Sequence, residues 1–290
     1  MKHALAIAFG LLSSLGAVAG KVPEGFLLLH DKDYHPPENS RVLKTMRMKM
    51  SSENLVLTMG ELVLKGALTS TTGEEVQGLQ INPDQARYLL TKSTSQNSFV
   101  LGGKEQVEPE EKAPLLQVSV ILERAKDRWS ARLEKGEATK EQEEALGELE
   151  DEWNADFDSE MYGTKPRRIG EQGEVDANDI PGFRDAAEGV KGKVTLTLVG
   201  EKAVNGERFA RLKGTIDAVM MVKAEADDDP DTKIGLKGKI KLLRSLKYFT
   251  DTEIEMKGQM SMTVEGPGST GPMKMTGSGP FDFSGLRVLE

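Results

Sequence analysis

Residues 233–248 read KIGLKGKIKLLRSLKY, a run in which apolar and cationic residues alternate. Successive side chains on a β-strand point to opposite faces, so this run gives a strand one apolar and one cationic face. Residues 253–265 alternate in the same way, with Ile, Met and Val on one face and mainly polar residues on the other. We therefore predict two long strands joined by a turn.

The turn between these two runs sets an expected register. A three-residue loop at 249–251 would place Ile240 opposite Met260 and Leu236 opposite Val264. In that register the two apolar faces coincide, whereas a slip by one residue would turn one of them outward. We therefore expect both strands to bury the same face.

Residues 189–289 extend this pattern into five long antiparallel strands. Glycine weakens a strand and is tolerated where a sheet bends sharply. It recurs in mid-strand on the apolar face, at Gly214, Gly238, Gly258 and Gly277. The sequence therefore predicts a mainly β fold: a long, strongly curved antiparallel sheet, half-barrel or barrel-like, with one packed amphipathic helix.

The helix is predicted from a capping box and an apolar stripe. Thr139 and Gln142 have the spacing at which the Thr hydroxyl accepts from an unpaired backbone N–H at a helix start. Leu146, Leu149 and Trp153 then recur at helical spacing among many Glu residues. We expect this helix to lie on the sheet, and the sheet to curl around either the helix or a ligand.

Composition divides the chain into six segments. They are a signal peptide at 1–19, a lead-in at 20–40, N-terminal β hairpins at 41–135, the helix at 136–160, a connecting segment at 161–188, and the C-terminal sheet at 189–290. Residues 41–290 are expected to form one continuous domain. Within the N-terminal hairpins, small polar residues predict turns at 51–54, 71–73 and 95–97.

The first residues have the features of a targeting segment. An apolar run at 4–15 follows Lys2, and Ala17-Val18-Ala19 supplies the small residues that a signal peptidase needs before Gly20. The chain has no cysteine, hence no lipobox for acylation and no disulfide. We expect a cleavable signal peptide, a periplasmic or secreted protein, and a mature chain that does not span the membrane.

A resemblance follows from this architecture and from one segment. Long antiparallel strands, a Met-rich concave face and one packed helix resemble the half-barrel of lipoprotein carriers. The segment from Met161 to Glu171, MYGTKPRRIGE, resembles an element of uncharacterised secreted bacterial all-β proteins. The first resemblance implies a hydrophobic ligand, and the second implies no known activity.

Candidate metal and cofactor sites are weak. His30, Asp31, Asp33 and His35 have suitable ligand atoms, but they lie in the Pro-rich lead-in. Asp227, Asp229 and Asp231 could hold calcium weakly, although a solvated hairpin tip is the better interpretation because EF-hand spacing is missing. We predict no metal.

A glycine motif and the net charge bear on cofactors and nucleic acids. Gly266, Gly268 and Gly271 match a dinucleotide-binding spacing but open no helix that could hold a pyrophosphate, so no cofactor is predicted. A formal charge of -9 argues against a nucleic-acid partner.

The apolar face of the curved sheet is the remaining candidate site. Methionine is flexible and polarizable and suits surfaces that adapt to varied apolar partners, although a core filled with methionine is the competing interpretation. The candidate ligand-binding residues are Met220, Leu242, Met256, Met260, Met262, Met275 and Phe281.

No motif identifies an enzyme activity, and no catalytic residue is assigned. The leading hypothesis is an exported, non-enzymatic binding or structural protein that holds a hydrophobic ligand or lipid. One alternative is a periplasmic module that binds another protein. The other is a carboxylate-based hydrolase, because acidic residues are plentiful although nothing singles out two of them.

Overall fold

The computed structural model describes residues 27–28, 37–107, 112–126, 128–155, 157–180, 183, 187–222, 230–268 and 271–290. These residues form one antiparallel sheet of twelve strands in the order β6-β5-β3-β2-β1-β12-β11-β10-β9-β8-β7, with β4 paired to β3. The strands are β1 (Arg41–Met59), β2 (Leu62–Asn82), β3 (Gln85–Leu101), β4 (Lys104–Val107), β5 (Ser119–Ala125), β6 (Arg128–Leu133), β7 (Gln172–Asp176), β8 (Ala187–Val204), β9 (Glu207–Val222), β10 (Asp231–Ser245), β11 (Asp251–Gly268) and β12 (Gly271–Leu289).

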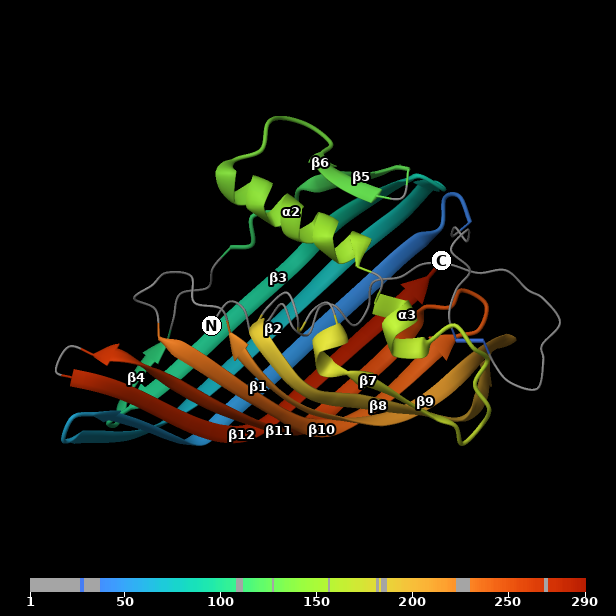
Figure 1. Cartoon of the computed structure of the whole chain (residues 1–290). Coiled ribbons are helices and arrows are strands. Elements are labelled where there is room, and N and C mark those ends of the chain that lie inside the picture. The colour runs from blue at the N-terminus through green and yellow to red at the C-terminus, as the bar shows by residue number, and fades with distance from the viewer. Residues whose placement is uncertain are drawn as a thin grey trace.

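The sheet is long, strongly curved and open, with β6 and β7 at its two ends (Figure 1). Two series of hairpins meet at its centre, where the first strand, β1, pairs with the last, β12. The predicted fold class is confirmed: a mainly β chain with a curved antiparallel sheet, compatible with a half-barrel, and a packed amphipathic helix.

The five strands predicted in the C-terminal part are β8 to β12, and their apolar residues face the concave side. Gly238 lies directly opposite Gly258, which in turn lies opposite Phe281. A Cβ atom on Gly238 would lie 2.9 Å from the Phe281 ring carbon Cζ, so the ring lies against the glycine pair. The glycines thus allow the bend, and an aromatic ring covers the space that they leave.

The register between β10 and β11 differs from the predicted one by four residues. Ile240 lies opposite Met256, and Leu236 lies opposite Met260. The loop is longer than expected because Ser245 ends β10 and organises the turn: its Oγ accepts from the backbone N–H groups of residues 247 and 248, at 3.2 and 3.0 Å. A shift by an even number leaves both apolar faces on one side, so that part of the prediction is confirmed.

The predicted helix is α2 (Lys140–Asn154), and its capping box is present. The backbone N–H of Gln142 donates to Thr139 Oγ1 at 3.3 Å, and the Gln142 side chain accepts from the Thr139 N–H at 3.1 Å. Leu146 and Leu149 are buried against β3 and β5, and the Trp153 ring packs edge-on against a Trp of β6. α2 therefore covers the N-terminal end of the sheet, away from the strands that curl most (Figure 1).

Two short helices were not predicted. α3 (Phe157–Tyr162) and the 3-10 helix η2 (Ala177–Asp179) follow α2. Met161, Tyr162 and Ala177 are buried in the same core cluster as the apolar residues of β8 to β12. These elements, rather than α2, pack on the C-terminal part of the sheet.

Three predicted turns in the N-terminal hairpins are wrong. Residues 71–73 lie within β2 and residues 95–97 lie within β3, where the two stretches pair with each other. Residues 51–54 lie in a β-bulge within β1, between positions 52 and 55 of its pairing with β2. Threonine favours strands. Because β2 pairs with β1 on one side and β3 on the other, its backbone N–H and C=O groups have strand partners, and this pairing overrides the turn-like composition.

The predicted signal peptide at 1–19, most of the lead-in at 20–40, and Asp227 and Asp229 of the predicted acidic hairpin tip lie outside the described residues. Within the described part of the chain, no helix combines the length and apolarity that a membrane crossing requires.

Candidate functional site

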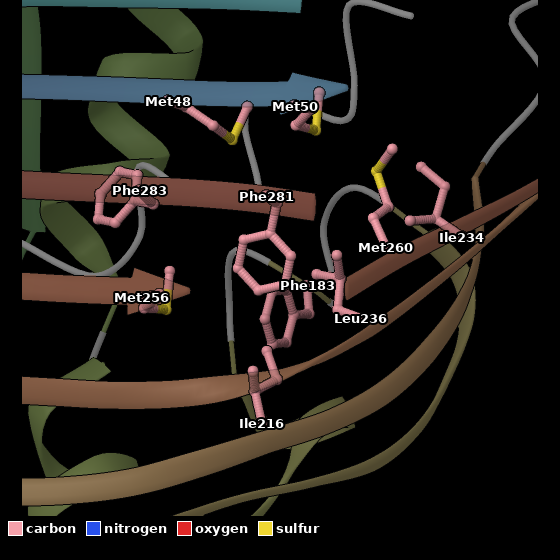
Figure 2. A pocket seen from close by; sticks show the side chains of 10 residues that line it. All are labelled: Met48, Met50, Phe183, Ile216, Ile234, Leu236, Met256, Met260, Phe281 and Phe283. Atoms are coloured by element: carbon pink, nitrogen blue, oxygen red, sulfur yellow. The ribbon is translucent and has the colours of Figure 1, made fainter. Parts of the chain in front are cut away.

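An apolar hollow lies on the concave face of the sheet (Figure 2). Strands β1, β9, β10, β11 and β12 contribute to it, together with one residue that precedes β8. All ten described lining side chains are apolar: Met48, Met50, Phe183, Ile216, Ile234, Leu236, Met256, Met260, Phe281 and Phe283. The cavity volume is about 40 Å³, which is more than one water molecule needs but far less than the pocket of a whole small-molecule ligand.

Phe183 closes part of this hollow. It is 2% exposed, and its backbone N–H donates to the carbonyl oxygen of Ile180 at 3.0 Å. Its ring lies beside Phe281 and above Ile216 in Figure 2. The concave face is therefore partly filled by a side chain of the protein itself.

The candidate ligand-binding residues divide between three places. Met256, Met260 and Phe281 line the hollow. Met220 and Leu242 are buried in the same core cluster outside the lining. Met262 and Met275 belong to a separate cluster near the other end of the strands, with Leu55 and Leu68.

Seven of the ten lining residues were not among the predicted site residues, including Met48, Met50 and Phe283. Met48 and Met50 lie on the alternating face of β1, but only the pairing of β1 with β12 brings them beside Phe283 and Phe281. That pairing joins distant segments and leaves no local signal in the sequence.

A buried cation lies next to the apolar core. The Arg244 side chain is fully buried on the concave face, and it donates to Asp158 at 2.5 Å, to Asp251 at 2.8 Å and to the carbonyl oxygen of Leu28 at 2.5 Å. The Tyr162 ring lies 3.9 Å from the guanidinium carbon. Burial alone would lower the pKa of Arg244, but the two carboxylates outweigh it and raise that pKa. Arg244 is therefore a satisfied buried cation that joins α3 to the sheet.

Two more cations extend this feature onto β12 and β1. Arg287 lies directly opposite Lys44, and their exposed fractions are 7% and 9%. Arg287 donates to the Thr250 hydroxyl, and Lys44 Nζ lies 3.2 Å from Glu152 Oε1 of α2. We call Arg244, Arg287 and Lys44 the cationic row.

Glu74 of β2 lies beside this row, opposite Met46. Burial raises its pKa to about 7, the positive charge of Lys44 opposes that rise, and the negative charge of Glu152 adds to it. Glu74 therefore changes charge near neutral pH, next to the cationic row.

The sequence contains a signal for the cationic row, namely charged residues at inward-facing strand positions. Position 244 falls on the apolar face of β10, between Leu242 and Leu246, and position 287 follows Phe283 and Gly285 on that face of β12. A charged residue at an inward position predicts a buried partner. Asp158 and Asp251 converge there, but at 2% and 4% exposure they neutralise Arg244 rather than face an open cleft.

Of the metal candidates, Asp231 alone lies among the described residues. Asp231 is exposed at the start of β10, opposite Glu265. Asp227 and Asp229 lie outside the described residues, as do the His and Asp residues at 30–35. Among the residues that the structure describes, no three His, Cys, Asp or Glu side chains group as metal ligands would.

The chain resembles known proteins in structure but not in sequence. No family model and no curated protein matches this sequence. A solved structure titled "Lipid-protein interactions in lipovitellin" is similar at a TM-score of 0.38 with 9% identity, and the match covers 86% of this chain and 25% of the lipovitellin chain. Any function of this chain has to be argued from its own residues.

Proposed function

We propose that this protein is an exported, non-enzymatic binding protein that holds a hydrophobic ligand, such as a lipid chain, on its Met-rich concave face. The observation that carries the proposal is the lining of the hollow: ten apolar side chains from five strands and one further segment converge there. A concave apolar site is the usual form of a site for an apolar ligand.

The size of the hollow sets a condition on binding. At about 40 Å³ it accepts only part of an acyl chain unless its lining rearranges. Four of the ten lining residues are methionines, at positions 48, 50, 256 and 260. Methionine is unbranched and has three rotatable side-chain bonds, so it changes shape at low cost. The ligand thus enters by repacking of the methionines and of Phe183.

Native mass spectrometry of the protein purified from its own host tests this proposal. Lipid that co-purifies, or an acyl compound taken up on titration, supports it. Met260→Gln should weaken uptake, and Met221→Gln should not, because Met221 lies on the outer face and is 37% exposed. The proposal would be contradicted if the protein shows only its own mass under gentle conditions and takes up no acyl compound on titration.

The export part of the proposal rests on the first nineteen residues and has its own test. Amino-terminal sequencing of the protein from its host should begin at Gly20, after Ala17-Val18-Ala19. A mature chain that still begins at Met1 would contradict export through a cleaved signal peptide.

A second candidate function is binding of another protein by the outer face of the sheet. Leu43 lies directly opposite Val288, and Leu286 is nearby on the same strand; they are 38%, 42% and 47% exposed. Apolar side chains grouped on an exposed face are a common feature of protein interfaces. A Leu286→Lys variant that loses a partner captured by the parent protein would favour this second function.

A further inference from the structure

The hollow and the cationic row lie on the same two strands. Met48 and Phe283 line the hollow and are cross-strand neighbours. Lys44 and Arg287, four positions further along β1 and β12, are also cross-strand neighbours. Four residues of strand span about 13 Å, and an even separation keeps all four side chains on the concave face. One ligand of moderate length can therefore contact both places.

One cross-strand pair separates the hollow from the cationic row, and the protein core covers it. Met46 and Gly285 occupy the intermediate pair, and both are buried on the concave face. Gly285 has no side chain, and Met46 is as adaptable as the methionines of the hollow. The apolar face of the two strands is thus continuous from the hollow to the cationic row, and a ligand chain that follows it has to displace the side chains that cover Met46.

The cationic row already binds carboxylates. Of the carboxylates that contact it, Asp158 comes from α3, Asp251 from the start of β11 and Glu152 from α2. The pair of Arg244 with its two aspartates is fully buried, so breaking it would leave uncompensated charge. The pair of Lys44 with Glu152 is different, since the side chains are 10% and 24% exposed. Moving Glu152 from Lys44 into water therefore costs less free energy than moving either aspartate away from Arg244.

We infer that the ligand of the hollow is a fatty carboxylate, whose chain lies along β1 and β12 from the hollow and whose carboxylate takes the place of Glu152 on Lys44. The inference rests on the proposed function and names the ligand class for it. Because one carboxylate replaces another, the exchange leaves the charge around Lys44 unchanged. A neutral head group would leave Lys44 without a counter-charge or leave its own polar atoms near Met46.

Calorimetric titration of the mature protein with dodecanoate, methyl dodecanoate and dodecanol tests this inference. The three compounds share one chain length and differ at the head. Dodecanoate should bind about tenfold more tightly than the neutral compounds, as expected for one charge-assisted hydrogen bond. Equal affinity for all three would overturn the inference and leave the proposed function standing. Binding of none of them, with no host lipid retained, would remove the proposed function as well.

Two variants that should change dodecanoate affinity in opposite directions locate the head group. Lys44→Gln should abolish the preference for dodecanoate, and Lys49→Gln, at an exposed position on the same strand, should keep it. Glu152→Gln should raise dodecanoate affinity several-fold by removing the competing carboxylate, whereas Glu148→Gln, one turn earlier on α2 and exposed, should not.

The second variant also protects the test against misfolding. Should Lys44→Gln fail to fold by circular dichroism, Glu152→Gln decides alone, because its side chain is the more exposed of the pair. Unchanged dodecanoate affinity in Glu152→Gln, or a preference for dodecanoate that persists in Lys44→Gln, would overturn the placement of the head group.

Discussion

The two halves of the sheet bury polar groups in different ways. In β8 to β12 the buried polar side chains gather at one end of the strands, at Arg244, Ser245, Asp251 and Arg287, and the rest of the concave face is apolar. In β1 and β2 they are spread along the strands: Lys44 and Gln80 lie near one end, and Ser52, Ser70 and Thr72 lie in mid-strand. A charge-bearing end beside a continuous apolar surface suits an amphiphile, whereas scattered hydroxyls suit only the packing of the strands. The C-terminal half, with β1, is therefore where we place the ligand.

The largest expected effect contrasts two buried cations, one from each half. Arg244→Gln should lower the free energy of unfolding by about 3–5 kcal/mol, because it leaves Asp158 and Asp251 buried without a counter-charge. Lys44→Gln should cost about 1 kcal/mol, since Glu152 can turn to water. Urea unfolding checks both values. Adding Asp158→Asn to Arg244→Gln should recover part of the loss, and a larger loss in the double variant would contradict the pairing.

The next effect contrasts two strand glycines. A Cβ atom at Gly258 would lie 2.2 Å from the Lys237 carbonyl oxygen, so Gly258→Ala forces the backbone apart and should cost about 3 kcal/mol. At Gly73 of β2 the nearest atom is the Thr94 hydroxyl oxygen at 3.1 Å, and Gly73→Ala should change stability by less than about 1 kcal/mol. Thermal unfolding measures the difference. Equal losses at both sites would contradict the difference in available space between these two glycines.

A pH effect should arise in the N-terminal half, at Glu74. Its pKa rises to about 7 in the folded chain from an ordinary value of 4.5, so the folded state binds a proton that the unfolded state has lost. The contribution of Glu74 to stability should therefore fall as pH rises from about 4.5 to 7 and level off above that, by about 3 kcal/mol in all. Glu74→Gln should flatten this part of the curve of unfolding free energy against pH. A curve that keeps its slope in the variant would assign the effect to other groups.

The smallest effect tests α2, which belongs to the N-terminal half alone. Thr139→Ala removes the hydroxyl that caps the helix and should cost about 1 kcal/mol. Because α2 packs on β3, β5 and β6, hydrogen exchange should quicken there and stay unchanged in β9 to β11. Faster exchange in both halves would show that they unfold as one unit.

The success of sequence-based prediction also differed between the halves. In β8 to β12 alternation is strict, so strand identity and the buried face followed from single residues such as Ile240 and Met256. The register between these two strands did not follow, because it depends on how Ser245 organises a loop through hydrogen bonds that composition does not encode. In β2 and β3 the Ser, Thr and Asn runs are compatible with both turns and strands. Only the pairing of these two runs with each other shows that they form strands.

The candidate site was predictable only in part for the same reason. Met256, Met260 and Phe281 could be named from their apolar face. Phe183 has no periodic neighbours that could have pointed to it, and the Met48 side of the hollow requires the pairing of β1 with β12. The cationic row could have been found, since Arg244 and Arg287 interrupt otherwise apolar positions.

The pairing of β1 with β12 also has a consequence for how the molecule is made. Val42 lies opposite Leu289, so the two hairpin series remain separate sheets until the final strand is in place. Contacts between such distant positions make folding slow, and the unpaired borders of β1 and β11 stay open to other chains meanwhile. A newly made chain is therefore exposed to aggregation until its last strand docks, and a chaperone that shields β1 should raise the yield of folded protein.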